Sequence, residues 1–316
     1  MPCGNGLNNL SGNSGRFVKL EFYTCDVFTE HRFGGNPLAV IPDARKLSSR
    51  QMQQIAREFN YSETTFVLPP KKGHDRKVRI FTPTREVPFA GHPNIGTAFV
   101  LAVNGLLGQV NDGKVITFEE KAGLVAVSMA INKSGEFRCE LLAPQDLKIG
   151  PLVMPELAAP ALSLEVADIN LSVHAPCVAG VGLPFLIVEL ISQEALERAR
   201  FNSVVMETLE KEGIAPDILL YTRNKGVQDI QARMFAPFDG VPEDPATGSA
   251  NCALAALLTH HDQALSGQYS WTISQGIEMG RPSVLYASTE KCDGKVTATR
   301  IAGDSVMVSH GEIYVD

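Results

Sequence analysis

The chain has 316 residues, of which 44% are hydrophobic and 20% charged, and its formal net charge is −7 at pH 7. This length and composition indicate a globular protein with one large domain or two of about 150 residues. Because the balance is acidic and no Lys/Arg run exceeds two residues, nucleic acid and anionic membrane surfaces are not expected as main partners. A small anionic substrate remains compatible, since a local positive site needs only a few groups.

The cysteines and the N-terminal residues bear on the compartment. Six cysteines are scattered without a C-x-x-C pair, which argues against a zinc site and a disulfide framework and favours a reduced, cytoplasmic protein. Residues 1–16 are rich in Gly, Asn and Ser and lack the apolar core of a signal peptide, so we expect a disordered tail. No apolar run reaches the roughly 18 residues of a membrane helix.

The first half of the chain alternates expected strands and helices. A helix is expected at residues 48–60, where apolar residues recur on one face, Ser48 and Gln51 match a capping box, and Asn60 is a suitable stop. A second helix is expected at residues 93–104, with a proline at its first position. The expected strands are residues 17–28, 38–42, 64–70, 77–83, 114–120, 124–131 and 137–142.

The second half repeats this order after a proline-rich segment, residues 143–160, which is expected to be a linker. The last residues, 306–315, are expected to form a hairpin. The other expected elements are strands at residues 184–191, 218–222 and 229–237 and helices at 193–211 and 249–258.

An internal repeat is the strongest sign of the chain's organisation. Residues 79–99, RIFTPTREVPFAGHPNIGTAF, resemble residues 233–254, RMFAPFDGVPEDPATGSANCAL. Five matched pairs share one offset of 154 residues: Arg79 with Arg233, Phe81 with Phe235, Pro83 with Pro237, Val87 with Val241, and Pro88 with Pro242. We therefore expect two similar lobes, residues 17–142 and 161–316, with the last strand in the second lobe or returned to the first.

Both copies of the repeat lead into a helix start, where chemistry is favoured. Beyond the matched pairs the second copy is three residues longer, so Gly91-His92 correspond to Gly248-Ser249. The first turn of a helix leaves backbone N–H groups unpaired, and the helix dipole adds partial positive charge. Glycine lets a ligand approach these groups closely. Two such helix starts facing each other predict a cleft that binds an anion such as a carboxylate.

Five ordered motifs resemble the phenazine-biosynthesis-like, PhzF-type family: DVFTEHRFGGNPLAV, SETTF, FTPTREVPFAGHPNIG, EDPATGSA and QGIEMGRPS. The resemblance covers nearly the whole chain from Phe17 onward. It implies the diaminopimelate epimerase-like fold, an α+β fold of two pseudo-symmetric lobes. Each lobe is a mixed, barrel-like sheet around a central helix, and the site lies between the lobes. Two similar lobes are also what the internal repeat predicts.

The resemblance assigns roles to three polar side chains. Glu63 of the S-E-T motif is implied as the general acid/base, which requires burial to raise its pKa toward neutrality. His92 is implied to face the substrate, and Asp244 to orient a polar substituent of it. Each has a structural alternative: a strand-edge glutamate, a histidine that only satisfies backbone groups, and an Asp-Pro turn. Arg281 and Asn36 are left open between substrate contact and structural pairing.

The resemblance also implies that Gly91, Gly248 and Ser249 bind a substrate carboxylate through backbone N–H groups, with the Ser249 hydroxyl as a further donor. Related racemases and epimerases of this fold use one cysteine at each helix start, but here these sites read AGHP and ATGS. Cys252 lies one turn further into its helix and is expected to be buried. A proton shuttle on one carboxylate therefore fits better than a two-thiol mechanism.

The expected function is thus a cofactor-independent isomerase, without a metal, acting on a small carboxylic acid, with a homodimer as the expected assembly. The alternatives are an amino-acid epimerase or racemase with non-cysteine bases and a non-catalytic metabolite-binding protein of the same fold. Two other motifs are set aside. PCGNG at residues 2–6 lies before any strand, and the adjacent His260 and His261 do not face one another on a helix.

Overall fold

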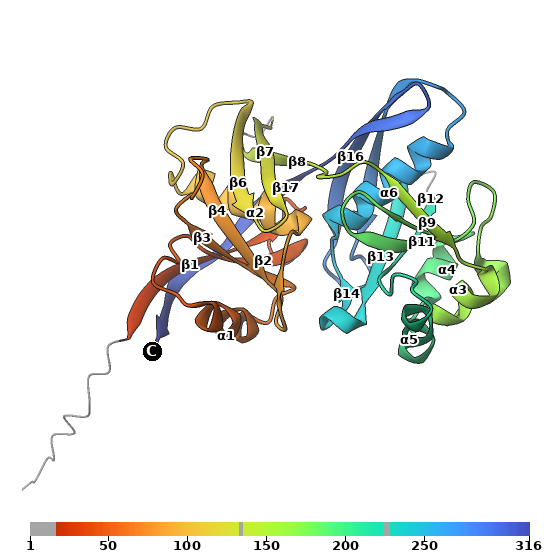
Figure 1. Cartoon of the computed structure of the whole chain (residues 1–316), viewed down its shortest axis with the longest axis horizontal. Coiled ribbons are helices and arrows are strands. Elements are labelled where there is room, and N and C mark those ends of the chain that lie inside the picture. Colours follow the sequence, from red (N-terminus) through yellow and green to blue (C-terminus); the bar gives the residue numbers. More distant parts are fainter. Residues whose placement is uncertain (1–16, 133–134, 224–227) are drawn as a thin grey trace, which may run out of the picture.

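Two lobes of similar build lie side by side in the computed structural model (Figure 1). The structure describes residues 17–132, 135–223 and 228–316, so the segment expected to be a disordered tail, residues 1–16, lies outside the described residues. The expected α+β fold, with two pseudo-symmetric lobes built from mixed sheets around helices, is confirmed. Among the described residues, no helix combines the length and apolar character that a membrane crossing requires.

Among the described residues, the first lobe is built from eight strands and two helices that precede residue 143. Its elements are β1 (Val18–Val27), β2 (Asn36–Ile41), α1 (Ser49–Phe59), β3 (Glu63–Leu68), β4 (Arg76–Phe81), β5 (Glu86–Val87), α2 (Gly91–Val103), β6 (Lys114–Glu120), β7 (Gly123–Ile131) and β8 (Phe137–Leu142). Helix α1 has the expected capping box of Ser48 and Gln51, and Asn60 ends it in the left-handed conformation. Helix α2 begins at Gly91, two residues before the expected start.

The second lobe follows the same plan with additional outer helices. Its elements are β9 (Lys148–Leu152), α3 (Pro155–Ala161), β10 (Cys177–Gly180), β11 (Pro184–Glu189), α4 (Gln193–Arg198), α5 (Ser203–Lys211), β12 (Ile218–Arg223), β13 (Ile230–Ala236), β14 (Val241–Asp244), α6 (Gly248–His261), β15 (Gly267–Gln275), β16 (Ser283–Cys292) and β17 (Lys295–Val315). The single helix expected at residues 193–211 is two helices, because Asn202 caps a new start by accepting a hydrogen bond from the Val205 N–H.

The sequence repeat extends to the strand pairing. In the first lobe, β1–β2, β3–β4 and β6–β7 pair antiparallel, whereas β2–β3 and β4–β6 pair parallel. In the second lobe the same alternation runs through β10–β11, β11–β12, β12–β13, β13–β15 and β15–β16. Helices α2 and α6 therefore occupy equivalent places, each following the short strand within its copy of the repeat, β5 or β14.

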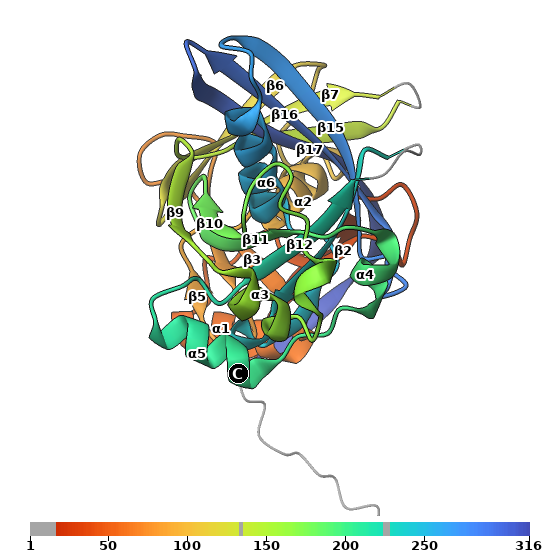
Figure 2. The same cartoon turned by 90° about the vertical axis from the view of Figure 1, so that its right-hand side faces the viewer.

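A helix lies inside each curved sheet, and shorter helices lie outside it. Figure 2 shows α6 surrounded by strands of the second lobe, with α3, α4 and α5 toward the outside. Nearly all residues of α2 and α6 are buried, which explains why both helices are apolar around their whole circumference. Gly96 of α2 allows close packing, since a Cβ there would lie 2.6 Å from the Leu38 and Val27 side chains.

Strand β17 joins the two lobes, and the hairpin expected at residues 306–315 is wrong. The strand pairs with β16 through Lys295–Ala302, with β8 through Arg300–Asp304, and with β1 through Ser305–Val315. Gly311 makes no turn. A Cβ at this position would lie 2.9 Å from the Phe22 ring, so the glycine instead makes room for a neighbour on β1.

The segment expected to be a linker contains secondary structure of the second lobe. Strand β9 pairs with β10, and α3 begins at Pro155 within the same segment. The chain crosses between the lobes just before β9. There the Ala143 N–H donates to the Thr299 carbonyl (2.8 Å) and the Gln145 N–H to the Val181 carbonyl (3.2 Å).

Candidate active site

The N-termini of α2 and α6 meet at the boundary between the lobes. A Cβ added to Gly91 would lie 3.2 Å from the Ser249 backbone nitrogen and 3.3 Å from the Gly248 Cα. The residues before the two helices, Ala90 and Thr247, cap neither helix with a side-chain hydrogen bond. Two positive helix ends therefore converge, and their first-turn N–H groups are not used by these side chains. This arrangement is suited to a carboxylate.

A cleft of about 650 Å³ lies between the lobes beside these helix ends. Glu63 lines it from the first lobe, and Asp244, Thr247 and Ser249 line it from the second. Its apolar wall comes from both lobes and is formed by Phe89, Leu183, Phe185, Met234, Phe238 and Val241. The cleft thus combines an apolar wall with a small number of polar groups, as small-molecule sites do.

Glu63 and His92, predicted as site residues, are neighbours. Glu63 is the first residue of β3, and its Oε2 lies 3.5 Å from His92 Nε2; the side chains are 17% and 4% exposed. Burial lowers the pKa of His92 to about 3, so the ring is neutral at physiological pH. The structure therefore places a neutral imidazole against the carboxylate at the cleft.

Asn36 connects the two lobes and sets the tautomer of His92. Its fully buried amide nitrogen lies 2.8 Å from Asp244 Oδ1, 2.8 Å from the Ala246 carbonyl and 3.2 Å from His92 Nδ1. Asp244 and Ala246 take the two shorter bonds of this nitrogen, and its longer contact with His92 Nδ1 favours the tautomer in which Nδ1 accepts and the neutral ring carries its proton on Nε2, facing Glu63. Asn36 therefore bonds protein groups on both sides of the site, which is the structural one of the two roles left open for it.

Asp244 is buried at the wall of the cleft and collects several donors. Its Oδ1 accepts from Ser62 Oγ (3.0 Å) as well as from Asn36, and its Oδ2 accepts from Thr247 Oγ1 (2.5 Å). Burial raises the pKa of Asp244, and these hydrogen bonds act in the opposite direction. Ser62 and Thr247 were missed by sequence reasoning, although both stand within the SETTF and EDPATGSA motifs, next to predicted residues.

Arg281 has a structural role. Its guanidinium donates to Asp26 Oδ1 (2.6 Å) and to the carbonyls of Gly34 (2.7 Å) and Gly35 (2.8 Å). It does not line the inter-lobe cleft. The structural alternative for this residue is therefore confirmed, and the pairing holds the GGNP turn that leads to Asn36.

The cysteine and histidine candidates for other chemistry lie away from the helix starts. Cys252 is buried one turn into α6, and burial raises the pKa of its thiol to about 12. His260 and His261 lie at the C-terminal end of α6. Within the described parts of the chain, no group of three or more His, Cys, Asp or Glu side chains is arranged to hold a metal ion.

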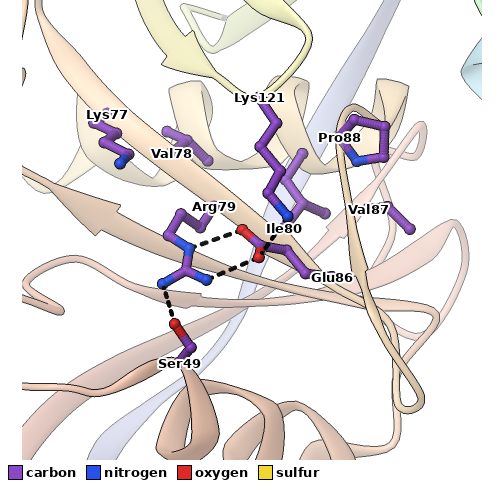
Figure 3. A pocket seen from close by; sticks show the side chains of 9 residues that line it. All are labelled: Ser49, Lys77, Val78, Arg79, Ile80, Glu86, Val87, Pro88 and Lys121. Carbon is purple, nitrogen blue, oxygen red and sulfur yellow. Dashed lines mark hydrogen bonds and ion pairs between the residues drawn. The ribbon is translucent and has the colours of Figure 1, made fainter.

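A second pocket, of about 260 Å³, lies on the first lobe around Arg79 (Figure 3). Three of its charged side chains pair with one another: Glu86 bonds Arg79 Nε at 2.8 Å and Lys121 Nζ at 2.8 Å, and the Arg79 pair lowers the pKa of Glu86 to about 2. The equivalent arginine of the second lobe, Arg233, pairs with Glu243 in the same way. The repeat therefore accounts for this pair, and none of the predicted site residues lines the pocket.

Two lobes with converging helix N-termini, and a carboxylate beside a neutral histidine at the cleft between them, are the arrangement expected of the diaminopimelate epimerase-like fold. The family model described as phenazine biosynthesis-like protein matches residues 25–311. The crystal structure of the Bacillus anthracis phenazine biosynthesis protein of the PhzF family superposes with a TM-score of 0.85 at 26% identity, covering 94% of this chain and 99% of that one. The chain belongs to the phenazine biosynthesis-like family and is an isomerase.

Two curated relatives are similar over almost their whole length. An uncharacterised isomerase of Mesorhizobium japonicum is 36% identical over 298 residues, 92% of this chain and 97% of the relative. The trans-2,3-dihydro-3-hydroxyanthranilate isomerase of Pseudomonas aeruginosa is 33% identical over 295 residues, 93% of this chain and 99% of the relative. The predicted family and enzyme class are therefore confirmed.

Proposed function

We propose that the chain is a cofactor-independent isomerase that moves a proton between two carbons of a small carboxylic acid held between the lobes. The observation that carries this proposal is the convergence of the α2 and α6 N-termini beside Glu63 at the cleft. The helix ends supply a binding site for the acid group, and Glu63 supplies a base within reach of the bound carbon skeleton.

In the proposed step, the backbone N–H groups of Gly91, Gly248 and Ser249, with the Ser249 hydroxyl, hold the substrate carboxylate. Glu63 takes a proton from an allylic carbon, and the electrons of that C–H bond shift the double bond along the skeleton. The same carboxyl then returns the proton to the far end of the shifted double bond. No atom is gained or lost, so the reaction requires only one proton acceptor.

His92 and Asp244 support this step from opposite sides of the cleft. His92 Nε2 has no hydrogen-bond partner among the described residues and lies 3.5 Å from Glu63 Oε2, so in the proposed step it moves closer and donates to the Glu63 carboxylate before and after each transfer. Asp244 lines the cleft, and hydrogen bonds such as that from Thr247 fix its carboxylate in place. In the proposed step this fixed carboxylate orients a polar substituent of the substrate. The apolar wall around Phe185 and Phe238 accommodates the carbon skeleton.

The substrate we propose is an unsaturated cyclic carboxylic acid of the kind that names the Pseudomonas relative. The test is to incubate the protein in heavy water with trans-2,3-dihydro-3-hydroxyanthranilate and with a panel of small unsaturated carboxylic acids, and to follow ring hydrogens by NMR. A product whose double bond has moved, with either deuterium or the original hydrogen at the far carbon, supports the proposal. Inversion at the α-carbon without double-bond migration would instead indicate an epimerase, and binding without exchange a non-catalytic protein.

A further inference from the structure

Glu120, a half-buried glutamate whose carboxyl oxygens are buried, lies outside the proposed mechanism and has an internal counterpart in the second lobe. Strand β6 pairs with β4 through Lys77 and Glu119, and β15 pairs with β13 through Gln231 and Ser274. Lys77 and Gln231 are separated by the offset of the repeat, 154 residues. The residues that follow Glu119 and Ser274 are Glu120 and Gln275, so these two occupy equivalent positions at the ends of their strands.

Gln275 holds the turn that leads into α6. Its Oε1 accepts from the Thr247 N–H (3.1 Å) and from Asn251 Nδ2 (2.7 Å), and its Nε2 donates to the Asp244 carbonyl (2.7 Å). Asn251 in turn donates to the Thr247 carbonyl at 2.9 Å. Gln275 Nε2 also donates to Thr247 Oγ1 (3.1 Å), so the amide uses its oxygen and both N–H groups to fix the helix start that carries Gly248.

The first lobe has a carboxyl group at the position of this amide, and one bond of the arrangement recurs there. Asn94 Nδ2 donates to the Ala90 carbonyl at 2.9 Å, as Asn251 does to Thr247. Both Glu120 carboxyl oxygens and Asn94 Oδ1 are buried and without a hydrogen-bond partner among the described residues. The Asn94 side chain is nevertheless close enough to act on the pKa of Glu120.

The surroundings of Glu120 disfavour its ionised form. The neighbouring Glu119 carboxylate accepts hydrogen bonds from the Lys71 and Lys72 backbone N–H groups. The next residue, Lys121, forms its ion pair with Glu86 (Figure 3). Burial raises the pKa of Glu120 to about 8, and Asn94 acts in the opposite direction.

Helix α2 contributes two further groups. His92 is neutral and adds no charge near Glu120. The positive end of the helix favours the ionised form of Glu120, but this effect is smaller than the effect of burial that raises its pKa to about 8. A neutral carboxylic acid offers an acceptor and one O–H donor, where the Gln275 amide uses an acceptor and two N–H donors, whereas a carboxylate has no donor.

We propose that Glu120 is a positioning residue that supports the start of α2 as a neutral carboxylic acid, from the position that Gln275 occupies beside the start of α6. Through Asn94 and Ala90 it places Gly91 and His92 at the cleft. Ionisation removes the donor and leaves a buried charge against α2. The effect on catalysis rests on the proposed function, whereas the effect on stability rests on the fold alone.

The sign of the pH dependence follows from the raised pKa. Below the ordinary glutamate range the carboxyl is protonated in both the native and the unfolded chain. Above that range the unfolded chain loses the proton while the native chain keeps it, so native stability falls as pH rises. The fall continues to about pH 8, where the native group also ionises, and then levels.

The test compares Glu120→Gln with the wild type and with Glu136→Gln, an exposed glutamate of the same lobe, by thermal unfolding from pH 4 to 9.5. We expect the melting temperature of Glu120→Gln, relative to the wild type, to rise between pH 4.5 and about pH 8 and then stay constant, and the control to show no such rise. The reciprocal Gln275→Glu should lose stability increasingly over the same range. A pH-independent difference, or a Glu120→Gln chain that does not fold, would overturn the proposal.

Activity supplies the second readout once a substrate is confirmed. We expect wild-type kcat to fall above about pH 8 and the Glu120→Gln variant to keep its kcat there. Identical alkaline limbs in the two proteins would contradict the positioning role. If no substrate is turned over at all, the proposed function fails, while the unfolding profiles still decide the state of Glu120.

Discussion

Substitution of Gly91 by alanine should separate the chemistry of the helix starts from the stability of the fold. The added Cβ would lie 3.2 Å from the Ser249 nitrogen and 3.3 Å from the Gly248 Cα, and backbone atoms cannot rotate away. The overpacking costs about 1–3 kcal/mol, offset by the roughly 0.5–1 kcal/mol that alanine gains over glycine in a helix. The net loss of stability is therefore small, about 0–2.5 kcal/mol.

The loss of activity should be larger, because the methyl group separates the two helix ends and occupies the space of the bound carboxylate. Removal of one donor to a bound oxyanion lowers rates by roughly 10²-fold, and we expect a decrease in kcat/KM of that order for Gly91→Ala. A tenfold change corresponds to about 1.4 kcal/mol, so this loss exceeds the expected destabilisation.

The matched control is Gly96→Ala on the same helix. Its Cβ would lie 2.6 Å from the Leu38 and Val27 side chains, so it should destabilise the fold more and alter kcat/KM less. Steady-state kinetics and urea unfolding of both variants make the comparison. Full activity in Gly91→Ala, or equal kinetic defects in the two variants, would refute the assignment of the helix starts as the carboxylate site.

Three further substitutions test the surroundings of the cleft. Asn36→Leu removes the donor shared by three buried acceptors, and we expect about 1–3 kcal/mol of lost stability by urea unfolding and a strong loss of turnover; near-normal kinetics would contradict its role in setting the His92 tautomer. Arg281→Met leaves the buried Asp26 without its cation and should cost about 2–4 kcal/mol while the folded protein keeps its KM, so a selective rise in KM would indicate substrate contact instead. Cys252→Ala should keep kcat within about 2-fold, because the thiol is buried with a pKa near 12; abolished turnover would point to thiol chemistry.

Local signals in the sequence predicted much of the fold. Ser48 and Gln51 produced the expected capping box of α1, because both partners of that contact lie within one turn. The offset that relates Arg79 to Arg233 predicted two lobes, and the two arginines make equivalent ion pairs with Glu86 and Glu243. Equivalent environments in a duplicated fold preserve such pairs, so the repeat is visible in the sequence.

Long-range pairing was harder to predict. The residues of β17 after Ser305 have a turn-like Gly311, yet they extend along β1, a partner more than 280 residues away in the chain. The position of Asn36 between Asp244 and His92 likewise depends on the meeting of both lobes. Neither arrangement has a local pattern, whereas Glu63 and His92 could be proposed because they stand in short motifs.

The most direct test of the account is solvent exchange with Glu63→Gln on a confirmed substrate. Gln fills the same space and cannot accept the proton, so we expect the variant to bind substrate with near-normal affinity by calorimetry. Its double-bond migration and its exchange of substrate hydrogens in heavy water should fall by at least about 10³-fold. Wild-type rates of migration and exchange in Glu63→Gln would contradict the claim that this carboxylate carries the proton.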